Sequence, residues 1–243
     1  MSKRKKIFIT SSFVISLIVV FVFFYLRPSP QKKQQSQQNN VLALEEDVEN
    51  MEAYQIQVEA ILQKPELPTG CEVTSLATVL QYWDYEIDKC DLADSFLEKG
   101  KIGETDFRKA FVGNPRSESS YGCYAEVIEK CANDYLISVD STLKVENITG
   151  SEFEHLYKYI QTDIPVIVWT TVDLKKPYKT TTWHVDGKDL TWLKNEHCVV
   201  LTGYDQEKVY VCDPLKGNVT YDADVFEERF EQLYSQAVVI YGR

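Results

Sequence analysis

The sequence feature that most restricts the possible folds is a series of short β-type segments in the last third of the chain. These segments are IPVIVW (164–169), HCVVLTGY (197–204), VYVCD (209–213) and AVVIYG (237–242). They are rich in branched and aromatic residues, as strands are, whereas the segments before them have helical periodicity. Helices followed by a run of strands predict an α+β domain.

The most distinct helical segment is TGCEVTSLATVLQYW, residues 69–83. Its apolar residues, among them Val73 and Leu80, recur at helical spacing. Thr69 and Glu72 match the capping box that often opens a helix. The pattern therefore predicts a helix with Cys71 in its first turn.

Weaker patterns predict further elements on both sides of this helix. Tyr54, Ile56 and Val58 alternate with polar residues, which indicates a strand. Further helices are predicted at 91–99, 123–132 and 151–160. In the last of these, Ser151 and Glu154 repeat the capping-box pattern.

Residues 7–26, IFITSSFVISLIVVFVFFYL, form an uncharged apolar run. A helix of that length rises about 30 Å, which matches the hydrocarbon thickness of a bilayer. Because the basic run Lys3–Lys6 precedes it, the positive-inside rule predicts that the N-terminus stays in the cytoplasm and everything after Arg27 is exported. The alternative is a cleaved signal peptide.

The polar segment that follows, PSPQKKQQSQQNNVLA (28–43), has almost nothing to bury and indicates a flexible stalk. The chain is therefore expected to consist of a basic cytoplasmic N-terminus (1–6), a transmembrane helix (7–26), a stalk (27–53) and a folded domain (54–243). The protein would be a single-pass protein of the plasma membrane with its C-terminal domain outside the cell.

The charge distribution argues against some classes of partner. Residues 1–33 contain seven basic and no acidic residues, so the rest of the chain has 19 basic and 37 acidic residues and a formal charge of −18. A domain this acidic repels phosphate backbones and anionic headgroups, which makes nucleic acid an unsuitable partner.

The position of Cys71 favours a nucleophilic role. The first turn of a helix stabilises a thiolate through its partial positive charge and its unpaired N–H groups, so Cys71 is expected to be more acidic than an ordinary thiol. A base is also required, and among His155, His184 and His197 the best placed is His197, at the start of a predicted strand.

A hairpin would bring an acid to His197. If the strands 197–204 and 209–213 pair with Tyr204 opposite Lys208, then His197 and Asp213 lie close together on one face. Asp213 could then orient the imidazole. Gln63, eight residues before Cys71, could offer a side-chain amide N–H to the developing oxyanion beside the backbone N–H of Cys71.

Several blocks together resemble one known family. Gln63, then PELPTGCEVTSLATVL, IPVIVW, NEHCVVLTGYD and VYVCDPLKG are similar in order and spacing to the C39-like branch of the papain-like cysteine peptidases. This resemblance covers roughly residues 55–240 and implies a papain-type fold with a site at Gln63, Cys71, His197 and Asp213. Relatives in bacteriocin exporters cleave after a double-glycine leader, but their substrate is not transferred to this chain.

The expected function is thiol-dependent hydrolysis of a peptide or isopeptide bond outside the cell, with no metal or organic cofactor. Two alternatives stay open at this point. An amine rather than water could resolve the same acyl-enzyme, which would make the protein an acyl transferase. A papain-like groove could also bind peptides without catalysis.

The remaining cysteines and histidines are given structural interpretations. Cys198 and Cys212 are expected in the core, and a bridge among Cys90, Cys123 and Cys131 stays open. His155 is expected on a helix surface and His184 in a polar loop. The cysteine spacings match no zinc-binding pattern.

Overall fold

The structure is a computed structural model in which residues 53–242 are described. The transmembrane helix expected at 7–26 and the stalk up to residue 52 lie outside the described residues. Within 53–242, no helix is both long enough and apolar enough to cross a membrane.

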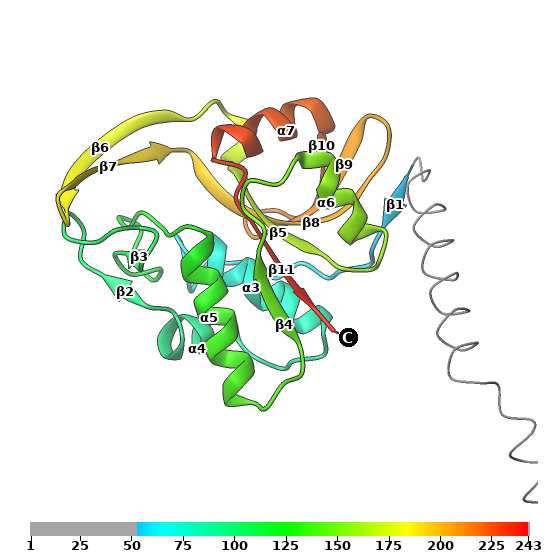
Figure 1. The fold of residues 1–243 in the computed structure, drawn as a ribbon, viewed down its shortest axis with the longest axis horizontal. Coiled ribbons are helices and arrows are strands. Elements are labelled where there is room, and N and C mark those ends of the chain that lie inside the picture. The colour runs from blue at the N-terminus through cyan, green and yellow to red at the C-terminus, as the bar shows by residue number, and fades with distance from the viewer. Residues whose placement is uncertain (1–52, 243) are drawn as a thin grey trace, which may run out of the picture. The chain divides into compact units, whose positions relative to one another are not determined.

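The described residues contain a seven-stranded main sheet with the order β10-β9-β8-β5-β11-β4 and with β1 paired to β8 (Figure 1). Its strands are β1 (Tyr54–Gln55), β4 (Lys144–Asn147), β5 (Val166–Thr171), β8 (Glu196–Tyr204), β9 (Lys208–Asp213), β10 (Gly217–Asp222) and β11 (Ala237–Tyr241). All pairings in this sheet are antiparallel. Every residue of β5 is buried, so the centre of the sheet is covered on both faces.

The helices are α3 (Cys71–Tyr82), α4 (Lys89–Ser95), α5 (Ala125–Ser138), α6 (Phe153–Ile160) and α7 (Ala223–Gln232), with a short 3-10 turn, η1 (Val172–Leu174). Helix α3 packs on β8 and contacts α4 and α5, which lie together in the lower part of Figure 1. Phe153 of α6 packs against Phe226 and Phe230 of α7, with ring centroids 5.8 and 5.4 Å apart. The α+β architecture with an antiparallel sheet confirms the fold class predicted from the sequence.

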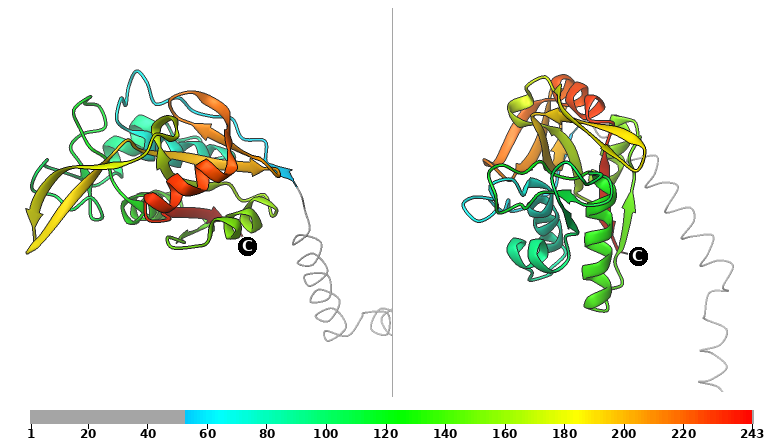
Figure 2. Two further views of the ribbon diagram at one scale, coloured as in Figure 1. Left: turned by 90° about the horizontal axis from the view of Figure 1, so that it is seen from above. Right: turned by 90° about the vertical axis from the view of Figure 1, so that its left-hand side faces the viewer.

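A long hairpin of β6 (Tyr178–Val185) and β7 (Lys188–Lys194) projects from the body of the domain (Figure 2). Its anchor is Trp183, whose indole N–H donates to the carbonyl of Thr105 at 2.8 Å. The expectation of a polar loop around His184 is wrong, since His184 lies in β6. The polar character of the Thr180–Thr182 run suggested a loop. Threonine is nevertheless β-branched, and β-branched residues are favoured in strands. A smaller two-stranded parallel sheet pairs β2 (Lys99–Gly100) with β3 (Phe111–Val112).

The predicted capping boxes are wrong at both helix starts. Helix α3 begins after Gly70 without a side-chain cap, and the Glu72 carboxylate accepts the backbone N–H of Cys123 at 2.7 Å. The Ser151 hydroxyl donates to the carbonyl of Ile148 at 2.7 Å rather than capping α6. In both cases a partner outside the helix replaces the local pairing that the sequence pattern suggested.

Several element boundaries also differ from the prediction. Strand β1 ends at Gln55, although the N–H of Ile56 still donates to the carbonyl of Thr202 at 2.7 Å. Helix α4 begins at Lys89, after an N-cap at Asp88, and ends at Ser95, so residues 96–99 are not helical. Helix α5 runs six residues beyond the predicted end at residue 132, to Ser138. The start of α4 follows from the side chain of Asp88, which accepts the N–H of Cys90 at 2.7 Å.

Candidate active site

Cys71 is the first residue of α3 and is 7% exposed. The residue before it, Gly70, is needed because a Cβ there would lie 2.8 Å from the Cβ of Leu67. The tight approach of the preceding turn therefore sets the direction in which α3 begins. As predicted, the thiol lies in the first turn of a helix.

His197 and Asp213 are brought together by the β8–β9 hairpin. His197 Nε2 lies 2.7 Å from Asp213 Oδ1, and the two side chains are 3% and 1% exposed. Asp213 also accepts the N–H of Leu215 at 2.8 Å and the hydroxyl of Tyr221 at 3.0 Å. Burial disfavours ionisation of Asp213, but these donors, led by His197, outweigh it and hold the pKa of Asp213 below its usual value.

The ionised Asp213 fixes the proton of the imidazole. Because a carboxylate can only accept, Nε2 of His197 carries the hydrogen that points to Asp213. This leaves Nδ1 as the nitrogen that can accept a proton from a nucleophile.

The register of the hairpin differs from the prediction and still produces the expected pair. Tyr204 lies opposite Val209 rather than Lys208, but a bulge between Leu201 and Gly203 shifts the pairing by one residue. Beyond the bulge Val200 lies opposite Cys212, which is the register that the sequence analysis assumed.

Gln63 lies at the same site, but its amide group points to the backbone. Nε2 donates to the carbonyls of Leu67 at 3.1 Å and Pro68 at 2.8 Å, while Oε1 is buried without a partner. Exchanging the two amide atoms would put an oxygen against two carbonyls, so this orientation is the favourable one. In this structure both amide hydrogens therefore stabilise the turn before α3.

A cavity of about 600 Å³ joins these residues. Gln63, Cys71 and His197 line it together, and so do residues of the β6–β7 hairpin such as Tyr178 and Trp192. The nucleophile and base candidates, which are far apart in sequence, thus share one cleft.

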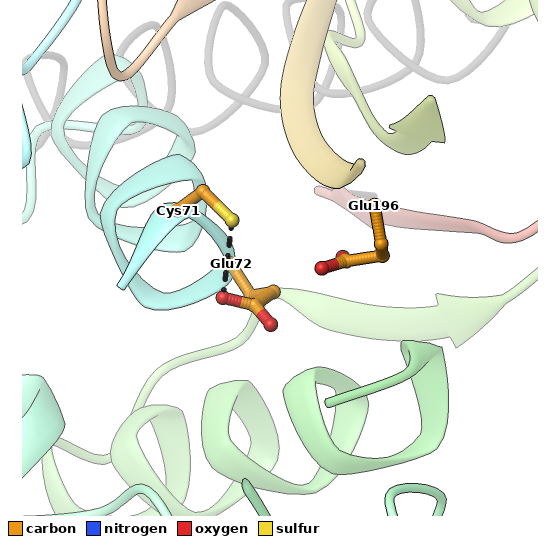
Figure 3. Close-up of side chains that lie close together, drawn as sticks. All are labelled: Cys71, Glu72 and Glu196. Atoms are coloured by element: carbon orange, nitrogen blue, oxygen red, sulfur yellow. Dashed lines mark hydrogen bonds between the residues drawn. The ribbon is translucent and has the colours of Figure 1, made fainter. Parts of the chain in front are cut away.

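Two carboxyl groups absent from the sequence-based site lie beside the thiol, one on a buried residue and one on a half-buried residue (Figure 3). The Cys71 thiol lies 3.3 Å from Glu72 Oε2 and can donate to it, and Glu72 is fully buried. The side chain of Glu196 points toward both, and its Oε1 is buried without a partner. Gly122 makes room for the pair, since a Cβ there would lie 2.4 Å from Glu72 Oε1 and 3.2 Å from Glu196 Oε2.

These surroundings overturn the expectation of an unusually acidic thiol. Burial, reinforced by the charges of Glu72 and Glu196, raises the pKa of Cys71 well above that of an ordinary thiol. Burial also raises the pKa of Glu72 to about 7, and burial together with the Glu72 charge raises the pKa of Glu196 well above its usual value. The raised pKa favours a neutral Cys71 thiol in the resting protein.

The sequence does contain a signal for a buried Glu72, although the same residue also matches the capping-box pattern. The first ten residues of α3, Cys71–Leu80, are all buried, and Glu72 is the single charged residue among them. A charge in such a helix has to meet a partner inside the protein. Glu196 carried no comparable signal, because a charged residue at a strand start is common.

The other cysteine and histidine interpretations can be compared directly. Cys198 and Cys212 are buried, as expected for core residues, and all six cysteines are free, so Cys90, Cys123 and Cys131 form no bridge in this structure. His155 is exposed on α6, as expected for a surface residue.

A helix that begins with a cysteine and packs on an antiparallel sheet carrying a His–Asp pair defines a papain-like fold. The chain belongs to the Peptidase_C39-like family, whose model matches residues 54–238. It is 33% identical over 184 residues to the uncharacterized protein YvpB of Bacillus subtilis (strain 168), covering 74% of this chain and 72% of that one. It is also similar to the crystal structure of a candidate C39-like peptidase from Bacillus anthracis, with 37% identity, a TM-score of 0.72, and coverage of 79% of this chain and 99% of that chain.

Proposed function

We propose that this protein is a membrane-anchored extracellular cysteine peptidase that hydrolyses peptide or isopeptide bonds. The observation that supports it most is the His197–Asp213 pair, which opens onto the same cavity as Cys71 at the start of α3. Family membership supports a cysteine peptidase in general. The anchor rests on the apolar run 7–26 and its basic flank.

In the proposed reaction, Nδ1 of His197 removes the proton of the neutral Cys71 thiol as Sγ attacks the substrate carbonyl carbon. The C–N bond then breaks, and Nδ1 returns the proton to the leaving amine. Water, deprotonated by the same nitrogen, releases the acyl group and restores the thiol. Asp213 holds the imidazole and stabilises the imidazolium that forms in each half of the reaction.

The oxyanion would bind the backbone N–H of Cys71 at the helix start and the amide of Gln63. Because Gln63 Nε2 donates to Leu67 and Pro68 in this structure, this role requires the side chain to rotate when substrate enters. Its unpartnered Oε1 means that the rotation breaks no hydrogen bond on that side of the amide.

The test is a digest of a defined peptide library by the purified full-length chain, with products identified by mass spectrometry. We expect cleavage that disappears in Cys71→Ala and His197→Ala. A parallel digest with added amines separates hydrolysis from acyl transfer, since a transferase would form amide products only when an amine is present. Cleavage that persists unchanged in Cys71→Ala, or the absence of any product from the parent, would contradict the peptidase assignment.

A further inference from the structure

The thiol and the two carboxyl groups beside it form a compact group of three metal-binding side chains. In this thiol–carboxyl cluster, one ligand atom each from Cys71, Glu72 and Glu196 lies within 4.8 Å of the other two (Figure 3). Cys71 and Glu72 come from the start of α3, and Glu196 comes from the start of β8. The packing of α3 on β8 therefore fixes the cluster.

The cluster contains acidic groups without a compensating cation. Among the described residues, no Lys, Arg or His side chain forms an ion pair with Glu72 or Glu196. Buried carboxylates normally have such a partner or coordinate a metal. Glu72 receives only the backbone N–H of Cys123 and the weak donor of the Cys71 thiol.

Unpartnered polar atoms gather at the same place. Glu196 Oε1 is buried without a partner, and so is the hydroxyl of Thr171, a residue 1% exposed that pairs with Glu196 across β5 and β8. The hydroxyl of Tyr124, whose residue is 4% exposed, is also unpartnered, and burial together with the charge of Glu196 raises its pKa. Buried polar atoms of this kind require a bound water, ion or ligand to complete them.

We propose that the thiol–carboxyl cluster is a zinc site, in which Zn²⁺ binds Cys71 Sγ and one carboxylate oxygen each of Glu72 and Glu196. The fourth position faces the cavity, which Cys71 and Glu196 both line, and takes water. On binding, the thiol and any protonated carboxyl release their protons to solvent, and no group is oxidised or reduced. A thiolate ligand excludes Mg²⁺ and Ca²⁺, which prefer oxygen ligands.

One of the three ligand pairs already has the spacing that zinc requires. With bonds of about 2.3 Å to sulfur and about 2.0 to 2.2 Å to oxygen, adjacent ligands of a tetrahedral ion lie roughly 3.5 Å apart. Cys71 Sγ and Glu72 Oε2 are already 3.3 Å apart. The N–H of Cys123 holds the other oxygen of Glu72 and so orients the ligand.

The consequence for activity rests on the proposed function. An ion bound to Cys71 Sγ occupies the electron pair that attacks the substrate, so the zinc-loaded protein would be an inactive peptidase. The cluster would make the site sensitive to free zinc at the place where the protein acts.

The experiment measures metal binding directly, without relying on activity. Purified full-length chain is stripped with a chelator, and Zn²⁺ is then titrated in competition with a chromophoric zinc indicator. We expect one equivalent per chain. Glu196→Gln should weaken binding at least about tenfold, whereas Glu118→Gln should leave zinc binding unchanged, because Glu118 is exposed and lines the cavity outside the cluster.

A second measurement identifies the sulfur ligand. Cd²⁺ should produce a thiolate-to-metal charge-transfer absorption that disappears in Cys71→Ser and persists in Glu118→Gln. No zinc binding, or binding that is equally strong in Glu196→Gln and Cys71→Ser, would overturn the proposal. Binding that depends on His197 but not on Glu72 or Glu196 would also overturn it.

The two proposals fail in different ways. A chain that cleaves peptides but binds no zinc retains the peptidase assignment and loses the zinc site. A chain that binds zinc through the cluster but cleaves nothing retains the site and loses the peptidase assignment.

Discussion

Opposing influences act on the thiol of Cys71. The start of α3 favours the thiolate, whereas burial and the neighbouring carboxyls disfavour it, and the second influence is larger. The sequence showed the helix start, but burial and the positions of Glu72 and Glu196 depend on the complete fold. In the proposed reaction, the thiol would therefore need His197 to remove its proton rather than act as a preformed thiolate.

At the residue scale we first predict the effect of removing one neighbouring charge. In chelator-treated protein, Glu72→Gln should shift the pH dependence of Cys71 alkylation by iodoacetamide to lower pH, because the amide keeps an acceptor for Cys123 but carries no charge. Glu118→Gln serves as the control. Identical profiles for Glu72→Gln and the parent would show that Glu72 does not influence the thiol.

The second prediction separates the base from the residue that orients it. His197→Ala should abolish turnover, because the proposed reaction loses the group that takes the thiol proton and returns it to the leaving amine, whereas Asp213→Asn should leave a slower but measurable reaction. The asparagine retains an acceptor for His197 but loses the charge that stabilises the imidazolium. The single-turnover rate on a peptide that the parent protein cleaves measures the activity of both variants. Full activity in Asp213→Asn would exclude the orienting role.

Most residues of the predicted site could be identified from the sequence because local spacing places them. Cys71, His197 and Asp213 lie at the start of a helix and on one hairpin, where spacing determines direction. The sequence placed Gln63 at the site, but it did not show where the N–H groups of its side-chain amide point. The carbonyls of Leu67 and Pro68 accept both of these hydrogens. Glu196 was missed because its importance arises only when α3 packs on β8.

At the element scale, the sequence predicted most accurately the strands that are buried. The central strands β5, β8, β9 and β11 were predicted within two residues of their observed ends, because continuous apolar runs mark them. The elements β4, β10, α7 and the β6–β7 hairpin were missed, since their residues are largely polar and exposed on one side.

The hairpin gives the prediction at this scale. Trp183 is the single buried residue of β6, so Trp183→Ala should release the hairpin from the domain without unfolding the sheet. Hydrogen exchange should accelerate at residues 178–194 and stay slow in β8. The variant Lys179→Ala, at an exposed position of the same strand, should leave the exchange unchanged, and equal acceleration in β8 would contradict a local role for Trp183.

At the scale of the whole molecule, the apolar N-terminal run would determine where the domain acts. We predict that protease treatment of intact cells removes the domain, because the run 7–26 and its basic flank orient the chain with residues after Arg27 outside. Immunodetection of the domain before and after treatment measures this. A mature chain that starts near residue 28 and is released into the medium would establish the signal-peptide alternative instead.

Strand β11 links the end of the described chain to the interior of the fold. It lies between β5 and β4, and it is the sole partner of β4 in the sheet. The sheet therefore cannot be completed until residue 241 has been synthesised, although Cys71 and His197 are made much earlier. A chain that stops a few residues short would present two unpaired edges to other proteins, so premature termination would yield an aggregation-prone product.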